Sequence, residues 1–322
     1  MSKKKPPLFV VAGPTACGKT SAAIALAHQI NGAVISADSM QVYRGMDIGT
    51  AKPTLAEREG VPHYMIDEFA PNEPFSAAIF VKMASAYARQ IYAAGQIPIL
   101  TGGTGFYINA FLTANPFDEG LPDTDYREWL ALEAQARGAD WLYEQLRAID
   151  PAYADTTHPN NVKRVIRALE YHHQTGGCLS EKNLREKRRT PDYDVENGFF
   201  VLSRGRANLY EAIDRRVDEM VASGLVAEVA ALLAKGYAPG LVSMQGLGYK
   251  EIVSHLAGGV PLAEAIDTVK RGTRRFAKRQ LTWFRGQCPQ AVWLDMDTLT
   301  PSAAAAQMAC AANAPGTWVS TE

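Results

Sequence analysis

The 322-residue chain has little of what marks a membrane protein or a disulfide-stabilised protein. No apolar run approaches the roughly 18 residues that a membrane-spanning helix needs, so we expect no membrane span. The 4 cysteines are far apart and form neither a CxxC pair nor a zinc-binding pattern, which predicts reduced thiols in a cytoplasmic protein. The formal net charge is -1, so the total charge gives no sign of a polyanionic partner, and any basic site must be local.

What the sequence does have is the alternation typical of an α/β fold. Short β-rich segments at 8–12, 33–37 and 97–100 are separated by helical patterns at 19–29 and 76–93. Strand, helix and strand in that order predict a parallel sheet with right-handed crossovers. Helices are therefore expected to flank a parallel-sheet core.

The strand pattern disappears in the middle of the chain. We predict an all-helical insertion over residues 118–189, with helices at 125–137 and 161–174. A core built from residues 1–117 and 190–322 then resumes, because further strands are expected at 198–203 and 291–295. The helices expected between those strands span 207–223, 225–235, 249–257 and 261–285. Beyond residue 300 the alanine-rich tail is expected to be frayed or to form a short loose helix.

A phosphate-binding loop follows the first expected strand. The segment matches G-x-x-x-x-G-K-[ST] and directly precedes a helix, which is the context this motif requires. Its backbone N–H groups can surround an anion, the lysine adds a charge, and the Thr20 hydroxyl can hold Mg²⁺. The expected ligand is a di- or triphosphate bound by Gly13, Pro14, Thr15, Ala16, Cys17, Gly18, Lys19 and Thr20. The loop alone does not distinguish transfer, hydrolysis or departure of the phosphate.

Two further positions help to distinguish transfer, hydrolysis and departure of the phosphate. A nucleotide hydrolase has a strand that ends in a Mg²⁺-holding aspartate, whereas the 97–100 segment is followed by Thr101 and glycines. Asp38 follows the 33–37 segment, so it is expected at the carboxyl edge of the sheet, where a carboxylate beside Lys19 can accept a proton. The alternative is that Asp38 and Ser39 only cap a turn.

One expected helix carries an unusual run of cations. Lys270, Arg274 and Lys278 form one row, and Arg271, Arg275 and Arg279 form the adjacent row, with no acid in the 270–279 segment. A solvated face is the usual explanation of such a run, but an unbalanced run on a nearly neutral protein favours contact with nucleic-acid phosphates. Lys163 and Arg164 repeat the pattern in the expected insertion.

Six motifs together are specific to one family. The most specific is DSMQVYRGMDIGTAKP at 38–53, and the others occupy 13–20, 102–107, 164–170, 245–251 and 273–280. In these motifs the sequence resembles the tRNA dimethylallyltransferases, in particular the bacterial form. The motifs occur in order over nearly the whole chain. Cys17 departs from the family, which commonly has serine at that position.

The resemblance implies transfer of a dimethylallyl group from dimethylallyl diphosphate to N6 of adenosine 37 in tRNAs that read codons beginning with U. On this interpretation diphosphate is the leaving group, Mg²⁺ assists, and Asp38 accepts the N6 proton. Thr101 is placed near the reacting centre, and Arg216, or its neighbour Arg215, on the diphosphate. A monomer that binds the tRNA anticodon stem-loop is expected. The tRNA contacts implied are Asp38, Ser39, Met40, Gln41, Arg127, Asn160, Asn161, Val162, Lys163, Arg164, Gln245, Gly246, Gly248, Tyr249, Lys250, Lys278 and Arg279.

Three other functions fit parts of the pattern. An ATP-dependent small-molecule kinase would use the same loop and Asp38. A non-enzymatic RNA-binding protein could use a nucleotide as a conformational switch. An isopentenyltransferase acting on free adenylate would not need two basic surfaces.

Overall fold

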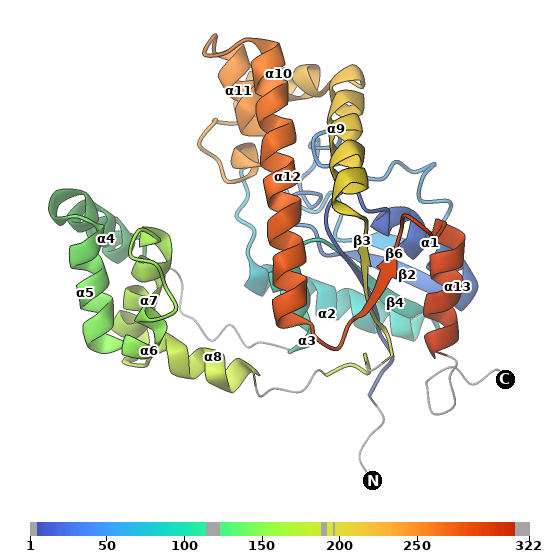
Figure 1. The fold of residues 1–322 in the computed structure, drawn as a ribbon, viewed down its shortest axis with the longest axis horizontal. Coiled ribbons are helices and arrows are strands. Elements are labelled where there is room, and N and C mark those ends of the chain that lie inside the picture. Colours follow the sequence, from blue (N-terminus) through green and yellow to red (C-terminus); the bar gives the residue numbers. More distant parts are fainter. Residues whose placement is uncertain (1–4, 114–122, 188–191, 196, 313–322) are drawn as a thin grey trace. The chain divides into compact units, whose positions relative to one another are not determined.

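The computed structural model describes residues 5–113, 123–187, 192–195 and 197–312 (Figure 1). The chain divides into two compact units, one formed by Met1–Ala114 with Pro191–Glu322 and the other by Asn115–Thr190. The insertion boundaries expected from the sequence, at 117/118 and 189/190, lie outside the described residues. Within the described ranges, no helix is long and apolar enough to cross a membrane.

The first unit is built on a six-stranded parallel sheet with the strand order β3-β2-β4-β1-β5-β6. This confirms the predicted α/β fold, and all five strands expected from the sequence are present. β3 was not predicted, because its two residues are too few to carry a periodic pattern. The strands are β1 Phe9–Ala12, β2 Gly32–Ser36, β3 His63–Tyr64, β4 Ile97–Gly102, β5 Phe199–Ser203 and β6 Val292–Asp295.

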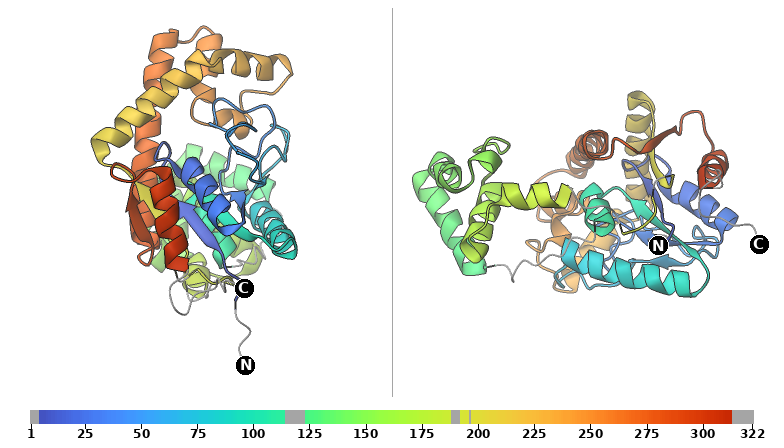
Figure 2. Two further views of the ribbon diagram at one scale, coloured as in Figure 1. Left: turned by 90° about the vertical axis from the view of Figure 1, so that its right-hand side faces the viewer. Right: turned by 90° about the horizontal axis from the view of Figure 1, so that it is seen from below.

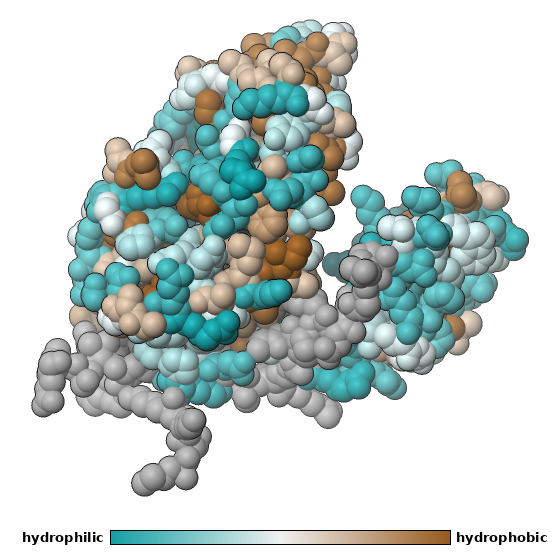
Figure 3. Space-filling view, turned by 180° about the vertical axis from the view of Figure 1, so that it is seen from behind, coloured by the Kyte–Doolittle hydropathy of each residue, from teal (hydrophilic) through white to brown (hydrophobic). Residues whose placement is uncertain are grey.

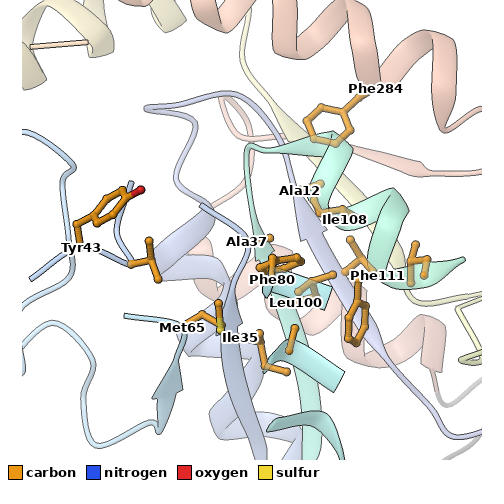
Figure 4. Packing of buried hydrophobic residues seen from close by; sticks show 14 of the residues in the cluster. Ala12, Ile35, Ala37, Tyr43, Met65, Phe80, Leu100, Ile108, Phe111 and Phe284 are labelled. Atoms are coloured by element: carbon orange, nitrogen blue, oxygen red, sulfur yellow. The ribbon is translucent and has the colours of Figure 1, made fainter. Parts of the chain in front are cut away.

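The sheet is covered on both faces because alternate residues of each strand point to opposite sides. On β1, Val10 and Ala12 belong to one buried cluster with side chains of α2 (Ala77–Ala93) and α3 (Gly105–Leu112) (Figure 4). Phe9 and Val11 belong to a second cluster with α1 (Lys19–Ile30) and α13 (Pro301–Ala312). Figure 2 shows these helices on the two sides of the strands.

Helix α13 shows that, of the two alternatives expected for the segment after residue 300, the short helix is right over Pro301–Ala312, although this helix is not loose. Ala304, Ala305 and Met308 are fully buried in the cluster that includes α1. Small alanine side chains let two helices approach closely, so a segment that is weakly amphipathic in sequence still packs as part of the core. Helix α3 was also missed, because it is short and begins directly at a glycine-rich turn.

Four further helices and a 3₁₀ turn complete this unit. α9 follows β5, and Figure 1 shows α9 rising from the end of that strand beside α12. The carboxyl ends of the strands thus face these helices. Their bounds are α9 Arg206–Ala222, α10 Leu225–Ala234, η1 Ser243–Gln245, α11 Tyr249–Leu256 and α12 Leu262–Gln287.

The regular elements in the described residues of the second unit are all helices, as predicted for the insertion. Leu130, Leu142, Leu146 and Val165 are central to its own apolar cluster, and Figure 3 shows mainly hydrophilic side chains on the face of this unit turned to the viewer. In the first unit, the backbone N–H of Asp192 donates to the Leu112 carbonyl (3.1 Å), so the chain leaves and re-enters that unit at one point. The helices are α4 Thr124–Arg137, α5 Ala139–Ile149, α6 Pro151–Ala154, α7 Val162–Thr175 and α8 Leu179–Lys187.

Candidate active site

The phosphate loop joins β1 to α1 in a conformation that its glycines permit. Gly13 has a φ of +146°, and a Cβ there would lie 2.3 Å from the Leu202 carbonyl oxygen, so only glycine fits. Gly18, the N-cap of α1, has a φ of +94°, and the intervening Ala16 also has a positive φ, of 62°. The loop therefore directs its backbone toward the start of α1, whose N-terminus favours an anion.

Lys19 and Arg216 bring positive charge to this loop from two different helices. The Lys19 ammonium donates to the Pro14 carbonyl (2.6 Å), and Arg216 of α9 donates to the Thr15 hydroxyl (3.3 Å). Burial lowers the pKa of Lys19, and Arg216 lowers it further, whereas Asp38 opposes the shift. Arg215 is exposed and faces Glu219 at 3.8 Å. The structure thus places Arg216, and not Arg215, at the loop.

Asp38 comes directly after β2 and uses one carboxylate oxygen to hold the following turn. Its Oδ1 accepts from the backbone N–H groups of Met40 (2.8 Å) and Gln41 (3.3 Å). Its Oδ2 has no hydrogen-bond partner among the described residues. Turn capping and proton acceptance, which were alternatives from the sequence, therefore use different oxygens and are compatible.

A cavity of about 90 Å³ brings the predicted catalytic residues together. Its lining includes Thr15, Lys19, Thr20, Asp38, Gln41, Thr101 and Arg216. It adjoins a larger cleft of about 860 Å³, since Thr20, Ala51 and Arg216 line both. A ligand held at the loop can therefore extend into the larger space.

Thr101 and Thr20 supply hydroxyl groups to the cavity. Thr101, near the end of β4, donates to the Val11 carbonyl (3.0 Å), which leaves its oxygen lone pairs available as acceptors. Thr20 makes no side-chain hydrogen bond within the part of the chain that the structure describes. No cluster of three or more His, Cys, Asp or Glu side chains suited to a metal occurs in the described ranges. The Thr20 hydroxyl is an oxygen donor of the kind that Mg²⁺ accepts, since this ion commonly keeps several waters and binds through substrate phosphates and few protein oxygens.

Gln280 of α12 is a site residue that the sequence analysis missed. Its Oε1 accepts from the Thr15 N–H (3.0 Å), and its Nε2 donates to the Gly103 carbonyl (3.0 Å). The side chain is buried and occupies the space beside Gly103, where a Cβ would lie 2.1 Å from Nε2. It therefore ties the phosphate loop to the turn after β4. The available signal was a polar residue four positions after Phe276, on the apolar face of a helix otherwise notable for its arginines.

Glu228 of α10 is a second residue that was missed. Its carboxylate accepts from three consecutive backbone N–H groups, those of Asp47 (2.9 Å), Ile48 (2.7 Å) and Gly49 (3.1 Å). It also accepts from the Tyr249 hydroxyl (2.7 Å). A Cβ at Gly49 would lie 2.6 Å from the Tyr249 ring, so the turn rests directly on that ring. One carboxylate thus connects the segment that follows Asp38 to α11.

The same arrangement corrects the role expected for Tyr249. Its side chain is 0% exposed, and burial together with Glu228 raises the pKa of its hydroxyl. Tyr249 is therefore a core side chain that supports the site, and its ring is not exposed on the surface. The segment that precedes Tyr249 nevertheless contacts the turn that follows Asp38, because a Cβ at Gly246 would lie 2.5 Å from the Met40 methyl group.

Gln41 connects the turn at residues 47–51 to the segment that holds Asp38. Its Oε1 accepts from the Ser36 hydroxyl (3.0 Å), and its Nε2 donates to the carbonyls of Thr50 (3.3 Å) and Ala51 (3.2 Å). A continuous hydrogen-bonded path therefore runs from Glu228 through the 47–51 turn to the end of β2.

The positive charge of helix α12 is balanced by acids to a greater extent than its sequence indicates. Lys270 pairs with Asp218 (2.6 Å) and Arg274 pairs with Asp214 (2.5 Å), both on α9. The expectation that the whole run is unbalanced is therefore wrong at these two positions, because the balancing acids come from a helix that lies 52 and 60 residues earlier. Four exposed cations have no acidic partner among the described residues, namely Arg271, Arg275, Lys278 and Arg279.

The remaining predicted tRNA contacts differ in exposure. Arg127 forms an ion pair with buried Glu170 (2.7 Å), so its guanidinium is already engaged within the insertion. Gly248 is buried at a φ of 93°, where it begins α11. Val162 and Ser39 are partly buried. The exposed ones are Asn160, Asn161, Lys163, Arg164, Gln245 and Lys250.

The fold and the cavity define the class of protein. The sheet carries a phosphate-loop motif after β1, a carboxylate after β2 and no carboxylate at the end of β4. This arrangement is that of a phosphate-loop enzyme without the magnesium-binding aspartate of nucleotide hydrolases.

Comparisons with known proteins narrow this class. Residues 41–287 match the model of the IPP transferase family. The chain is 51% identical over 288 residues to a tRNA dimethylallyltransferase of Lachnoclostridium phytofermentans, covering 89% of this chain and 91% of that protein. The crystal structure of a tRNA delta(2)-isopentenylpyrophosphate transferase from Staphylococcus epidermidis has a TM-score of 0.71 at 38% identity, with 97% and 100% of the two chains covered. A eukaryotic dimethylallyltransferase acting on tRNA has a TM-score of 0.77 at 29% identity, with 91% of this chain and 74% of that chain covered. The chain belongs to the IPP transferase family.

Proposed function

We propose that the protein transfers the dimethylallyl group of dimethylallyl diphosphate to N6 of adenosine 37 in tRNAs that read codons beginning with U. The products are N6-dimethylallyladenosine in the tRNA and free diphosphate. The observation that carries this proposal is the single cavity in which Lys19, Arg216 and the Thr15 backbone lie together with Asp38. An anion-binding group and a proton acceptor are both present, as the transfer requires.

The phosphate loop and its cations bind the donor and stabilise the leaving group. Negative charge accumulates on diphosphate as the bond between C1 of the dimethylallyl group and oxygen breaks. The positive N-terminus of α1 and the Lys19 ammonium lie where that charge develops. Arg216 adds a planar set of N–H donors suited to two phosphate oxygens.

Asp38 acts as the base toward the acceptor adenosine. The adenine N6 forms the new bond to C1, the electron pair of the broken C–O bond leaves with diphosphate, and the proton released from N6 passes to Asp38 Oδ2. That oxygen is the one not used to hold the turn. The hydrogen bonds to Oδ1 fix the direction in which the carboxylate points, which is what a general base requires.

Mg²⁺ fits beside the loop, and Thr20 is the residue that would hold it. When bound, the ion would supply further neutralisation of the diphosphate charge. No acidic protein ligand is needed, because the donor's own oxygens and water would complete the coordination.

The acceptor base must leave its stack to approach Asp38. An anticodon loop is single-stranded, so this movement costs less than extrusion of a base from a duplex. The path would be bordered by Asp38 to Gln41 and by the exposed Gln245 and Lys250. Exposed cations of α12 would contact the phosphates of the anticodon stem-loop.

The test is to incubate the protein with Mg²⁺, dimethylallyl diphosphate and unmodified tRNA, without ATP, and to weigh the digested nucleosides by mass spectrometry. An adenosine heavier by one dimethylallyl group is the expected result. The matched control is Asp38→Asn, which can still accept the turn's N–H groups but cannot act as a base. Unmodified tRNA, together with turnover of ATP in the presence of a small hydroxyl compound, would instead establish a kinase.

A further inference from the structure

Phe276 of α12 lines the cavity of about 90 Å³ that holds Asp38, Thr101 and the phosphate loop, which we call the reaction cavity. Among the described residues that line this cavity, Phe276 is the one large apolar side chain. Ala51 is the other apolar residue, and the remaining ones are polar, charged or glycine. The aromatic ring is therefore the main apolar surface that the reaction cavity offers to a ligand.

Packing of the protein interior does not account for the position of this ring. Phe276 is only partly buried, and within the described ranges it belongs to none of the three buried apolar clusters. Its neighbour Ala277 is fully buried in the cluster that includes α1, whereas the Phe276 ring lines the reaction cavity. Ligand sites combine apolar surface with a few placed polar groups, so a ring in this position indicates that part of the ligand is apolar.

Two neighbours on α12 define where the ring lies. The Arg279 guanidinium carbon is 5.7 Å from the centre of the Phe276 ring, within the range of a cation–π contact. Gln280 follows Phe276 by one helical turn and accepts from the Thr15 N–H of the phosphate loop (3.0 Å). Side chains four positions apart on a helix are neighbours, about 5–6 Å apart. The ring therefore lies about one helical turn from the contact with the loop that would hold the diphosphate.

We propose that Phe276 contacts the dimethylallyl group of the donor and limits the length of that group to five carbons. The inference rests on the proposed function, because it takes dimethylallyl diphosphate as the donor. With the diphosphate at the loop and C1 turned toward the acceptor, the two methyl groups need an apolar surface that removes them from water. Phe276 supplies that surface in the same cavity. A ten-carbon prenyl group would need the space that the ring occupies.

The larger cleft adjoins the charged end of the donor and not its apolar end. The residues that line both spaces are Thr20, Ala51 and Arg216, and two of them are placed at Mg²⁺ and the diphosphate. Among the described residues, Phe276 and Thr101 line only the reaction cavity. A longer prenyl chain would have to pass the diphosphate to reach the cleft, so the ring sets the limit on chain length.

The test compares dimethylallyl diphosphate with geranyl diphosphate, which is one five-carbon unit longer, as donors to unmodified tRNA. Mass spectrometry of the digested nucleosides distinguishes the two products. The full-length unsubstituted protein is expected to prefer the shorter donor strongly. In Phe276→Ala, the ratio of kcat/KM for the shorter donor to kcat/KM for the longer donor is expected to fall by about 10- to 200-fold, the effect of a small size change in an apolar pocket. Part of this change is a gain of geranyl transfer, which an unfolded protein cannot show.

Two matched variants test whether the bulk of this particular ring is responsible. Phe276→Leu keeps much of the apolar volume, so its donor ratio is expected to lie closer to that of the unsubstituted protein than to that of Phe276→Ala. Phe106→Ala removes a phenylalanine that is 56% exposed and is not among the described residues lining the reaction cavity. This variant is expected to leave the donor ratio unchanged.

The outcomes separate the role of Phe276 from the proposed function. An unchanged donor ratio in Phe276→Ala would overturn the proposal. A higher KM for tRNA with an unchanged donor ratio would also overturn it, because the ring would then contact the acceptor adenine. If the unsubstituted protein modifies tRNA while either result is obtained, the assignment of Phe276 fails and the proposed function stands. If the unsubstituted protein leaves tRNA unmodified with both donors, the proposed function itself fails, and the assignment of Phe276 fails with it.

Discussion

Replacement of Glu228 by alanine tests whether a residue remote from the reacting atoms positions the acceptor side of the site. The change deprives the N–H groups of Asp47, Ile48 and Gly49 and the Tyr249 hydroxyl of their acceptor. Asp47 is exposed and can turn to water, whereas Tyr249 is fully buried and cannot. We expect a loss of about 2–5 kcal/mol in the free energy of unfolding, the usual range when a carboxylate that serves several partly buried donors is removed.

The effect on catalysis separates positioning from stability. The path from the 47–51 turn through Gln41 reaches the end of β2, so a relaxed turn shifts Asp38 relative to the phosphate loop. A displacement of about 1 Å can cost about 10²-fold in rate. At a temperature where the variant is still folded, we expect kcat to fall by about 10- to 100-fold, with the KM for dimethylallyl diphosphate nearly unchanged because the loop is untouched.

Three variants make the experiment decisive. Glu228→Gln keeps the size of the side chain and one acceptor oxygen, so it is expected to recover part of both losses. Tyr249→Phe removes one hydrogen bond and its donor together, and a loss of about 0.5–1.5 kcal/mol is expected. The double variant Glu228→Ala with Tyr249→Phe is expected to be less destabilised than the sum of the singles, because no buried hydroxyl is then left unpaired. Urea unfolding measures the free energy of unfolding of each variant, and steady-state kinetics measure its kcat and KM. A folded Glu228→Ala protein with an unchanged kcat would refute the positioning role.

Three other predictions follow from the site and the core. Asp38→Ala is expected to lower kcat by about 10²–10⁴-fold while tRNA binding stays largely intact; full activity would remove Asp38 as the base. Burial lowers the pKa of Lys19, so its ammonium loses its proton below the ordinary lysine value of 10.5. When diphosphate affinity is measured as a function of pH, we therefore expect the affinity to begin to fall below that value. Lys19→Arg should lack that alkaline loss, because arginine stays charged, and an identical pH profile in both proteins would contradict the assignment. Met308→Ala is expected to reduce the free energy of unfolding in urea by about 2–5 kcal/mol, and an unchanged midpoint would mean that α13 is not part of the core.

The features predicted correctly from the sequence are those encoded by neighbouring residues. The phosphate loop is a contiguous motif, and Asp38 follows a strand that its own apolar run reveals. The sequence of neighbouring residues is therefore sufficient to place the phosphate loop and Asp38 in the fold. Five of the six strands, the helical insertion and most helices were likewise predicted from local periodicity.

What was missed depends on contacts between distant segments. Gln280 bonds to Thr15 across 265 positions, and Glu228 bonds to Asp47 across 181. No local pattern marks Glu228, and the one local sign for Gln280 is that it is a polar residue on the apolar face of its helix. The acids that balance Lys270 were overlooked for the same reason, since Asp218 lies on another helix. Side-chain partners in the folded core decide these roles, and a single sequence does not reveal them.

The packing of α13 against α1 also constrains how the protein is made. The apolar face of α1 is translated long before Ala304, Ala305 and Met308, which cover it. A nascent chain therefore carries this face uncovered until α13 has been made, and an uncovered apolar face favours aggregation. The helix that anchors the phosphate loop thus depends for its full support on a segment that is distant in the sequence.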